Sequence, residues 1–425
     1  MMVQGTSRCG YAQRAVVVLM SLGLALPQPV MAGGPILVGG PTFGVEGAPF
    51  TWDTTSEIQY RTDGGTLGSL TNAQAIARVE SMFNVWENVA TANIGYNRAG
   101  AIQGVADGDV STAAEFDAAE GTCNANPPTQ NPIIFDTDGS VFTDLGFDPD
   151  VIGFAGPCLV NAAGRIISGE AALNGKWIDG NAANGELTSA EFDAAFIHEF
   201  GHLSGLDHSQ VNLNCLTASP CGAADLQGLP TMFPFLLSSE MATLATDDVA
   251  WISRLYPQTT GGTTFAGTHG TLTGVVRFSD GMTHAQGVNV IARRVDTGSN
   301  EDRRFAVSVV SGFKFTANPG QSVTANYLGG TDDNTGGSDF GSRQTGDIGL
   351  FEIPVPAGDY TVEVESIDPG FEGGSSVGPL SPPIPMPGAA PAAAGPFAVG
   401  AGMTVSVGDV VLLGTDPRFD QFEGP

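Results

Sequence analysis

The sequence predicts an α+β fold class, in which a mixed part of helices and strands is followed by an all-β part. Up to residue 256, segments with apolar residues three and four apart alternate with short segments of period two, the periods of helices and strands. Beyond residue 270 only the period of two remains, between turns rich in Gly, Asp and Asn. The length of 425 residues fits two or three domains.

The charge composition argues against two classes of binding partner. The chain has 16 Lys and Arg residues against 45 Asp and Glu residues, a formal net charge of −29. This excess argues against binding nucleic acid or an anionic membrane, because both need a basic protein surface. With 42% hydrophobic residues a sizeable core can form, and 14% charged residues with 59 glycines predict a chain rich in loops and strands.

Residues 1–32 have the pattern of a secretory signal peptide. Arg8 and Arg14 precede an apolar run over 15–26, which is too short to span a bilayer and is followed by small residues ending at Ala32. We therefore expect cleavage after Ala32 and a secreted, extracellular protein; a membrane anchor is the alternative. No second apolar run of about 18 residues follows, so the mature chain is expected to be soluble.

Export also bears on the cysteines. Four remain once Cys9 leaves with the signal, and an even number in an exported chain favours disulfides over free thiols or metal ligands. Cys215 and Cys221 bracket a short loop and are expected to pair, which leaves Cys123 with Cys158. Four cysteines allow three connectivities, and this is one of them.

The first part shows both periods in turn. Residues 33–50 are rich in Gly and Pro and are expected to be extended. Apolar spacing predicts helices over 72–89 and 188–203, with one further helix starting at Thr112. The expected strands are 58–61, 94–96, 133–135 and 165–178.

Two similar stretches of the chain each resemble the second half of a calcium-binding helix–loop–helix, but the first half of that loop is missing in both. Thr112 with Glu115, and Thr188 with Glu191, instead have the Thr-x-x-Glu spacing of a capping box. We therefore expect both stretches to start helices.

The composition changes after residue 257. Residues 258–270 are rich in Thr and Gly and are expected to form a linker, and residues 271–414 an all-β sandwich domain. Its expected features are strands over 271–278, 288–293 and 360–365, a Pro/Ala/Gly spacer over 379–396, and a tail over 415–425.

One eleven-residue segment, His-Glu-Phe-Gly-His-Leu-Ser-Gly-Leu-Asp-His, contains three of the chain's 5 histidines. His198 and His202 are four apart on a predicted helix and project from one face, and Gly205 allows a sharp turn that returns His208 to them. Three imidazoles leave the fourth position of zinc open, as in catalytic rather than structural sites. A water there would have a lowered pKa, and Glu199 is the expected general base and then general acid.

This segment resembles the zinc signature of the metzincin proteases. Three features are similar to their matrixin, or matrix-metalloprotease-like, branch: Ser209 after the third histidine, a methionine turn at Met232, and a closing helix over 244–256. The resemblance covers residues 51–257 and implies a zincin catalytic domain, a twisted mixed sheet with an active-site helix. It also implies one catalytic zinc and a substrate bound extended along an edge strand within 159–174.

The chain departs from that family in three respects. No cysteine switch precedes the domain, since the one similar pattern, at Cys9, lies in the signal peptide. The histidines of a structural zinc are missing, because the remaining His269 and His284 lie in the second part. Pro234 stands two residues after Met232, where the astacin and serralysin branches have a tyrosine.

Clustered aspartates give a second metal hypothesis. Asp136, Asp138 and Asp144 offer oxygen ligands of the kind calcium prefers, and related secreted proteases carry calcium in the equivalent loop. The alternative is ordinary Asp-Gly turn chemistry. Both interpretations stay open.

The second part carries no catalytic set. Residues 349–360 resemble a segment of carboxypeptidase-regulatory-like β-sandwich modules, which implies substrate attachment, spacing or stability, including binding to extracellular matrix or a surface. The sequence therefore predicts a secreted zinc metalloendopeptidase acting on protein or peptide substrates. The alternative is a non-catalytic exported adhesion or matrix-binding protein on a metzincin scaffold, against which the presence of Glu199 argues.

Overall fold

The computed structural model describes most of the chain between residues 33 and 412. The described residues are 33–120, 130–209, 211, 227–279, 281–282, 284–285, 288–295, 304–315, 341–365 and 393–412. The predicted signal peptide and tail, together with Cys123, Cys215 and Cys221, lie outside them. Within the described part, no helix is both long and apolar enough to cross a membrane.

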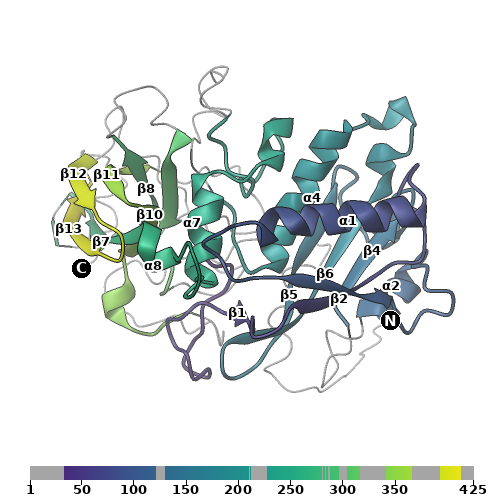
Figure 1. Ribbon diagram of the computed structural model, residues 1–425, viewed down its shortest axis with the longest axis horizontal. Coiled ribbons are helices and arrows are strands. Elements are labelled where there is room, and N and C mark those ends of the chain that lie inside the picture. The colour runs from purple at the N-terminus through teal and green to yellow at the C-terminus, as the bar shows by residue number, and fades with distance from the viewer. Residues whose placement is uncertain are drawn as a thin grey trace, which may run out of the picture.

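The first part of the chain is built on a six-stranded sheet (Figure 1). Its strands are β1 (Thr51–Trp52), β2 (Ile58–Thr62), β3 (Tyr96–Ala101), β4 (Pro132–Asp136), β5 (Gly153–Val160) and β6 (Arg165–Asn174). β6 pairs in parallel with β1 and β4, and β2 pairs in parallel with β3 and β4. β5 runs antiparallel to β6 and pairs with no other described strand, so it forms an edge.

Helices pack on this sheet, with α1 and α4 side by side in Figure 1. The helices are α1 (Asn72–Glu87), α2 (Ala113–Glu120), α3 (Ser140–Asp144), α4 (Ser189–Leu203) and α7 (Thr246–Leu255), with 3₁₀ turns at Gly175–Ile178, Ala182–Asn184 and Ser239–Ala242. The predicted caps are confirmed: Thr112 Oγ1 accepts from Glu115 N at 3.2 Å, and Thr188 Oγ1 accepts from Glu191 N at 3.3 Å. Each cap satisfies an N–H that the first helical turn leaves unpaired.

The core between α1 and α4 is aromatic. The rings of Phe83 and Phe200 stack with their centroids 4.0 Å apart. Trp86, whose side chain is fully buried, donates its indole N–H to the Ile197 carbonyl at 2.8 Å. Burying one such side chain stabilises the fold by roughly 1.5–3 kcal/mol. These contacts fix the apolar face of α4 against α1. They therefore also fix the direction in which the side chains on the opposite face of α4 point.

Several expectations for the first part are corrected. The strand expected to reach residue 178 ends at Asn174, whose side chain accepts the Lys176 N–H at 3.1 Å and starts a 3₁₀ turn. The strand expected over 94–96 begins at Tyr96 and runs to Ala101. The sequence does not predict β5, because Gly, Pro and Cys interrupt any alternation there.

Beyond residue 268 the described chain forms two β-sheets, seen at the left of Figure 1. Their strands are β7 (His269–Arg277), β8 (Asn289–Arg294), β9 (Ala306–Val310), β10 (Leu350–Pro356), β11 (Gly358–Glu365), β12 (Ala393–Val399) and β13 (Thr404–Val411). β10, β7 and β13 form one sheet, and β12, β11, β8 and β9 form the other. The two sheets contact each other through β9 with β10 and β12 with β13. The chain is α+β, as predicted, although the spacer expected to reach residue 396 already enters β12 at Ala393.

The two parts are joined more closely than the predicted linker over 258–270 suggests. The helical turn α8 (Phe265–Thr268) leads directly into β7. α7 lies between the two groups of strands (Figure 1), and one continuous hydrophobic core includes side chains of both parts. Trp251 of α7 packs edge-on against Phe313, which follows β9, with ring centroids 6.1 Å apart.

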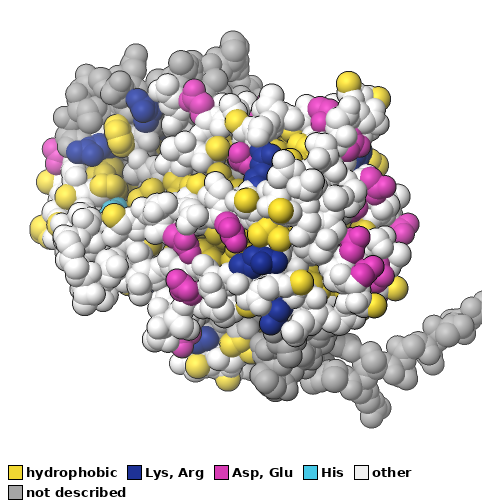
Figure 2. Space-filling view, turned by 45° about the vertical axis from the view of Figure 1, so that its right-hand side comes forward, with side chains coloured by type: hydrophobic (Ala, Val, Ile, Leu, Met, Phe, Trp, Pro, Cys, Tyr) yellow, Lys and Arg dark blue, Asp and Glu magenta, His cyan; other side chains and the backbone are white. Residues whose placement is uncertain are grey.

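The surface is sparsely charged. Figure 2 shows acidic and basic side chains scattered over one face, with most of that face uncharged. This distribution agrees with the charged fraction of 14%. Several buried hydrogen bonds surround the histidine segment.

Candidate metal centre

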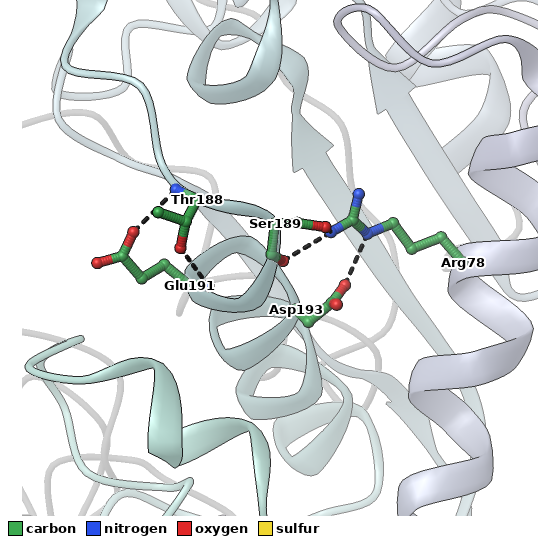
Figure 3. Close-up of polar contacts among 5 residues, drawn as sticks. All are labelled: Arg78, Thr188, Ser189, Glu191 and Asp193. Carbon is green, nitrogen blue, oxygen red and sulfur yellow. Dashed lines mark hydrogen bonds and ion pairs between the residues drawn. The ribbon is translucent and has the colours of Figure 1, made fainter.

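The helix that carries two of the histidines is fixed at its first turn (Figure 3). Thr188 N–H donates to Glu191 Oε2 at 2.8 Å, which completes the capping box. Arg78 of α1 pairs with Asp193 at 2.6 Å and donates to the Ser189 carbonyl at 2.6 Å. This ion pair is only partly buried, and pairs near the surface contribute about 1 kcal/mol or less. Its geometric effect is to hold α4 in one rotation against α1.

α4 ends in the turn that the sequence predicts at Gly205. This glycine has φ of +89°, in the left-handed region that L side chains avoid. Its N–H donates to the His202 carbonyl at 2.9 Å, and the Leu206 N–H donates to the Gly201 carbonyl at 3.0 Å. These two bonds form the Schellman motif, which ends a helix and redirects the chain.

The redirected segment is held by the N-terminal part of the chain. Ile36 N–H donates to the Gly205 carbonyl and Asp207 N–H donates to the Gly34 carbonyl, each at 2.9 Å. Residues 33–40 are buried, whereas composition predicted only an extended segment over 33–50. The N-terminal segment thus lines the turn that carries His208.

The turn brings His208 back to His198 and His202. The ligand atoms of these three side chains lie within 4.8 Å of one another, and in the described part they are the one group of His, Cys, Asp or Glu side chains close enough to hold a metal ion. His202 Nε2 and His208 Nε2 are 3.1 Å apart. The structure therefore assembles all three predicted metal ligands at one point.

The remaining ring nitrogens indicate how the histidines can bind. His198 Nδ1 lies 2.7 Å from the Thr231 carbonyl and His202 Nδ1 lies 2.9 Å from the Leu206 carbonyl. A carbonyl only accepts, so each Nδ1 carries the proton and each Nε2 presents a lone pair to the cluster. Burial lowers the pKa of His198 to about 4 and that of His202 to about 3, and it also lowers the pKa of His208. Three neutral imidazoles at pH 7 fit a metal ion.

Glu199 follows His198 on α4 and stays partly accessible. Burial raises the pKa of Glu199 to about 8, and a hydrogen bond from the Ala155 N–H of β5 opposes that rise. A cation held by the histidines would lower the pKa again. Glu199 is thus placed to gain and lose a proton near neutral pH.

The strand beside Glu199 corrects the expected substrate strand. That strand was expected within 159–174, but β6 pairs with neighbours on both sides and is internal. In the described part β5 (Gly153–Val160) pairs with β6 alone and so lies at one edge of the sheet, although six of its eight residues are buried; β3 lies at the opposite edge. Ala155 could be linked to Glu199 only through the structure, since no sequence pattern marks it.

Met232, the residue of the predicted methionine turn, is hydrogen-bonded to the segment that carries His208 and packs near Gly201 of α4. Its side chain is 2% exposed, and its carbonyl accepts the Ser209 N–H at 2.7 Å. The buried carboxylate of Asp248 accepts from Thr231 N at 2.8 Å and from Met232 N at 3.0 Å. Asp248 therefore shapes the loop whose Thr231 carbonyl orients His198. The sequence signal for it was present in the paired aspartates at the start of α7.

The predicted calcium ligands are used differently. Asp136 is buried and accepts the N–H groups of Gly139 at 3.0 Å and Phe142 at 2.9 Å, and Asp138 accepts the Ser140 N–H at 3.1 Å. These contacts are those of the turn interpretation. In the described part these aspartates form no cluster with the spacing of a metal site.

The structure bears on one partner of the predicted Cys123–Cys158 disulfide. Cys158 on β5 is disulfide-bonded. Its predicted partner Cys123, and the predicted pair Cys215–Cys221, lie outside the described residues. The disulfide of Cys158 ties the edge strand β5 to another part of the chain, so it restrains the strand that faces Glu199.

Gly201 gives a stability prediction. A Cβ at this position would lie 2.2 Å from Met232 Sδ and 2.9 Å from the Trp86 ring. We expect Gly201→Ala to lower the free energy of unfolding by roughly 1–3 kcal/mol through overpacking. Urea titration measures the change. Gly262→Ala, where a Cβ would meet nothing within 4 Å, is the control and should change stability by less than about 0.5 kcal/mol. Equal effects of both variants would contradict the argument.

Buried carboxyls give a pH prediction. Burial raises the pKa of Asp63 to about 7 and that of Asp248 to about 6, and burial together with repulsion from Asp248 raises the pKa of Asp247 to about 8. A folded state that holds these protons more tightly than the unfolded chain gains stability below the unfolded pKa of 3.8 and loses it as pH rises through about 7. Below about pH 6.5 the buried histidines, whose pKa values are lowered, oppose this trend, because the unfolded chain protonates them more readily. We therefore expect Tm of the chelated protein to fall between pH 7 and pH 8, by roughly 2–4 °C for each kcal/mol lost. A Tm that rises over this interval in differential scanning fluorimetry would be the opposite result.

No protein-family model and no curated protein matches this chain. Its function is therefore argued from its own residues and their arrangement.

Proposed function

We propose that this chain is an exported zinc-dependent metalloendopeptidase of the metzincin type, and that it hydrolyses protein or peptide substrates. The observation that carries the proposal is the convergence of His198, His202 and His208 within 4.8 Å, with Glu199 next to them on the same helix. A surface or scaffold role requires neither a neutral three-imidazole cluster nor a proton-exchanging carboxyl beside it.

The donor set supports zinc. Three neutral imidazoles without thiolate or carboxylate ligands match a tetrahedral site with one open position, as catalytic zinc sites have. When bound, zinc supplies a Lewis acid that polarises a carbonyl and acidifies water. Carbonyl partners on His198 and His202 already hold both rings in the ligating tautomer.

Glu199 supplies the proton transfers. Its carboxylate takes a proton from the attacking water and then donates it to the amide nitrogen of the leaving peptide. The Ala155 N–H fixes the direction of the carboxylate. The same carboxyl can serve in both directions within one turnover, because the proton that it takes from water is the one that it returns to the leaving amine.

β5 supplies the substrate platform. In the described part β5 pairs with β6 alone, and an extended peptide bound on its other side would add to the sheet as a further strand. Backbone pairing of this kind favours cleavage within a chain over removal of single terminal residues. Since Ala155 lies on β5 and contacts Glu199, a peptide on this edge lies beside the proton donor.

Cleavage profiling with metal analysis tests the proposal. The mature protein is incubated with a diverse peptide library, with and without 1,10-phenanthroline, and its zinc content is measured in the same preparation. We expect one equivalent of zinc and internal cleavages that stop with the chelator and return with added zinc. Equimolar zinc with no cleavage across the library would instead support the adhesion alternative.

A further inference from the structure

The C-terminal β part contributes directly to the geometry of the metal centre. We infer that Ser308 of β9 is a positioning residue. It holds in place both the segment that carries His208 and the loop that contains Thr231 and Met232, the methionine loop. The inference rests on the metal site of the proposed function. It assigns the second part a role beyond attachment or spacing.

Ser308 meets the first part through three separate atoms. Its N–H donates to Asp247 Oδ1 at 2.6 Å, its carbonyl accepts the Trp251 indole N–H at 2.8 Å, and its hydroxyl lies 3.3 Å from the Ser209 hydroxyl. Ser308 and Ser209 are fully buried and Asp247 is 2% exposed. A buried contact with all three polar groups paired is rigid, because each lost bond would leave a buried group unsatisfied.

One route from Ser308 reaches the histidines through α7. Asp247 also accepts from the Ser209 hydroxyl, and Ser209 immediately follows His208. Ser209 N–H donates to the Met232 carbonyl. The next residue on the helix, Asp248, holds the loop whose Thr231 carbonyl orients His198. Two consecutive aspartates thus face opposite partners, with β9 on one side and the methionine loop on the other.

A second route runs through the N-terminal segment. Gly33 packs directly on β9, where an added Cβ would lie 2.3 Å from the Ser308 carbonyl oxygen. The residues after Gly33 form the backbone bonds with Gly205 and Asp207 that hold the turn before His208. Both routes end on the same short segment, so a displacement of β9 would be transmitted to His208.

The coupling must act in both directions. If β9 favours the arrangement that binds zinc, zinc must favour the arrangement that protects β9, by the same free energy. Amide hydrogen exchange over 306–310 should therefore slow when zinc is added to the chelated full-length protein. Amides of β12, which is the strand farthest from β9 in its sheet, should change less.

Variants can distinguish an effect on the geometry of the metal centre from a general effect on the stability of the fold. Ser308→Ala removes the hydroxyl that contacts Ser209 and Asp247 and should raise the Kd for zinc about twofold to tenfold, and Asp247→Ala should raise it about tenfold to hundredfold. Ser311→Ala is the matched control, since Ser311 is a buried serine just after β9 whose hydroxyl, among the described residues, bonds within the second part, to Ala285 O at 2.6 Å and Val288 N at 3.1 Å. It should lower Tm without changing zinc affinity.

The measurements are zinc competition against a chromogenic chelator, Tm, and hydrogen exchange, none of which depends on cleavage. Weaker zinc binding in Ser308→Ala but not in Ser311→Ala, with zinc-dependent protection of β9, supports the inference. The inference would be overturned if both serine variants changed zinc affinity equally, or if hydrogen exchange of β9 did not depend on zinc. Either result would leave the proposed function standing. Wild-type protein that binds no zinc would overturn both.

Discussion

Replacing Glu199 with glutamine is expected to slow peptide-bond cleavage by roughly 10²–10⁴-fold while zinc content stays the same. Glutamine keeps the shape of the side chain, and its amide oxygen can still meet the Ala155 N–H. It cannot take a proton from water or return one to the leaving amine. Rates on a quenched fluorescent peptide, with metal analysis of the same sample, give both values.

Glu191→Gln is the control for that variant. Glu191 lies on the same helix, and its role is to accept the Thr188 N–H in the capping box, which a glutamine can also do. Its activity should stay close to that of the wild type. If Glu199→Gln cleaves as fast as Glu191→Gln, the assignment of proton transfer to Glu199 is wrong.

His202→Ala is expected to remove both stoichiometric zinc and detectable cleavage. His202 is one of the three proposed ligands; its Nε2 lies 3.1 Å from His208 Nε2, and the residue is 6% exposed. Losing a direct ligand should weaken zinc binding by more than the ~10–100-fold that outer partners of metal ligands cost. Zinc at about 100 times its Kd stabilises a folded protein by roughly 2.7 kcal/mol. That increase in Tm should be present in the wild type and absent in the variant.

His284→Gln is the corresponding control. This histidine lies in the second part, and its Nδ1 is 2.8 Å from the Ile348 carbonyl. Its replacement should leave zinc content and the zinc-dependent rise of Tm intact. Loss of zinc from both variants would mean that the metal is not held by the cluster of His198, His202 and His208.

The parts of the site that could be predicted are those with local causes. Helix spacing places His198 and His202 on one face, the capping pair at Thr188 begins their helix, and Gly205 ends it. Each of these depends on residues within a few positions of one another, so a period or a motif reveals them. The methionine turn was found by the same kind of local pattern at Met232.

The parts that could not be predicted depend on distant residues. The Asp247–Ser308 bond joins residues 61 apart, and the Ser209–Ser308 contact joins residues 99 apart. No spacing rule specifies such pairs, because the tertiary packing alone brings them together. β5 was missed for a related reason, since its residues lack alternation and its place is set by pairing with β6. The burial of residues 33–40 was missed because a Gly/Pro-rich composition indicates loops but not what covers them.

The sequence predicts two modules joined by a linker, and residues 259–263 of that connection are exposed. Because one hydrophobic core includes side chains of both parts, the parts are held together by more than this connection. A proteolytic cut there would sever the backbone without freeing either fragment, because α7, the N-terminal segment and β9 remain packed together. A nicked molecule would travel as one species in native chromatography and separate only under denaturing conditions. Transferring residues 51–257 onto an unrelated carrier would, by the same reasoning, remove part of the hydrophobic core that they share with the second part.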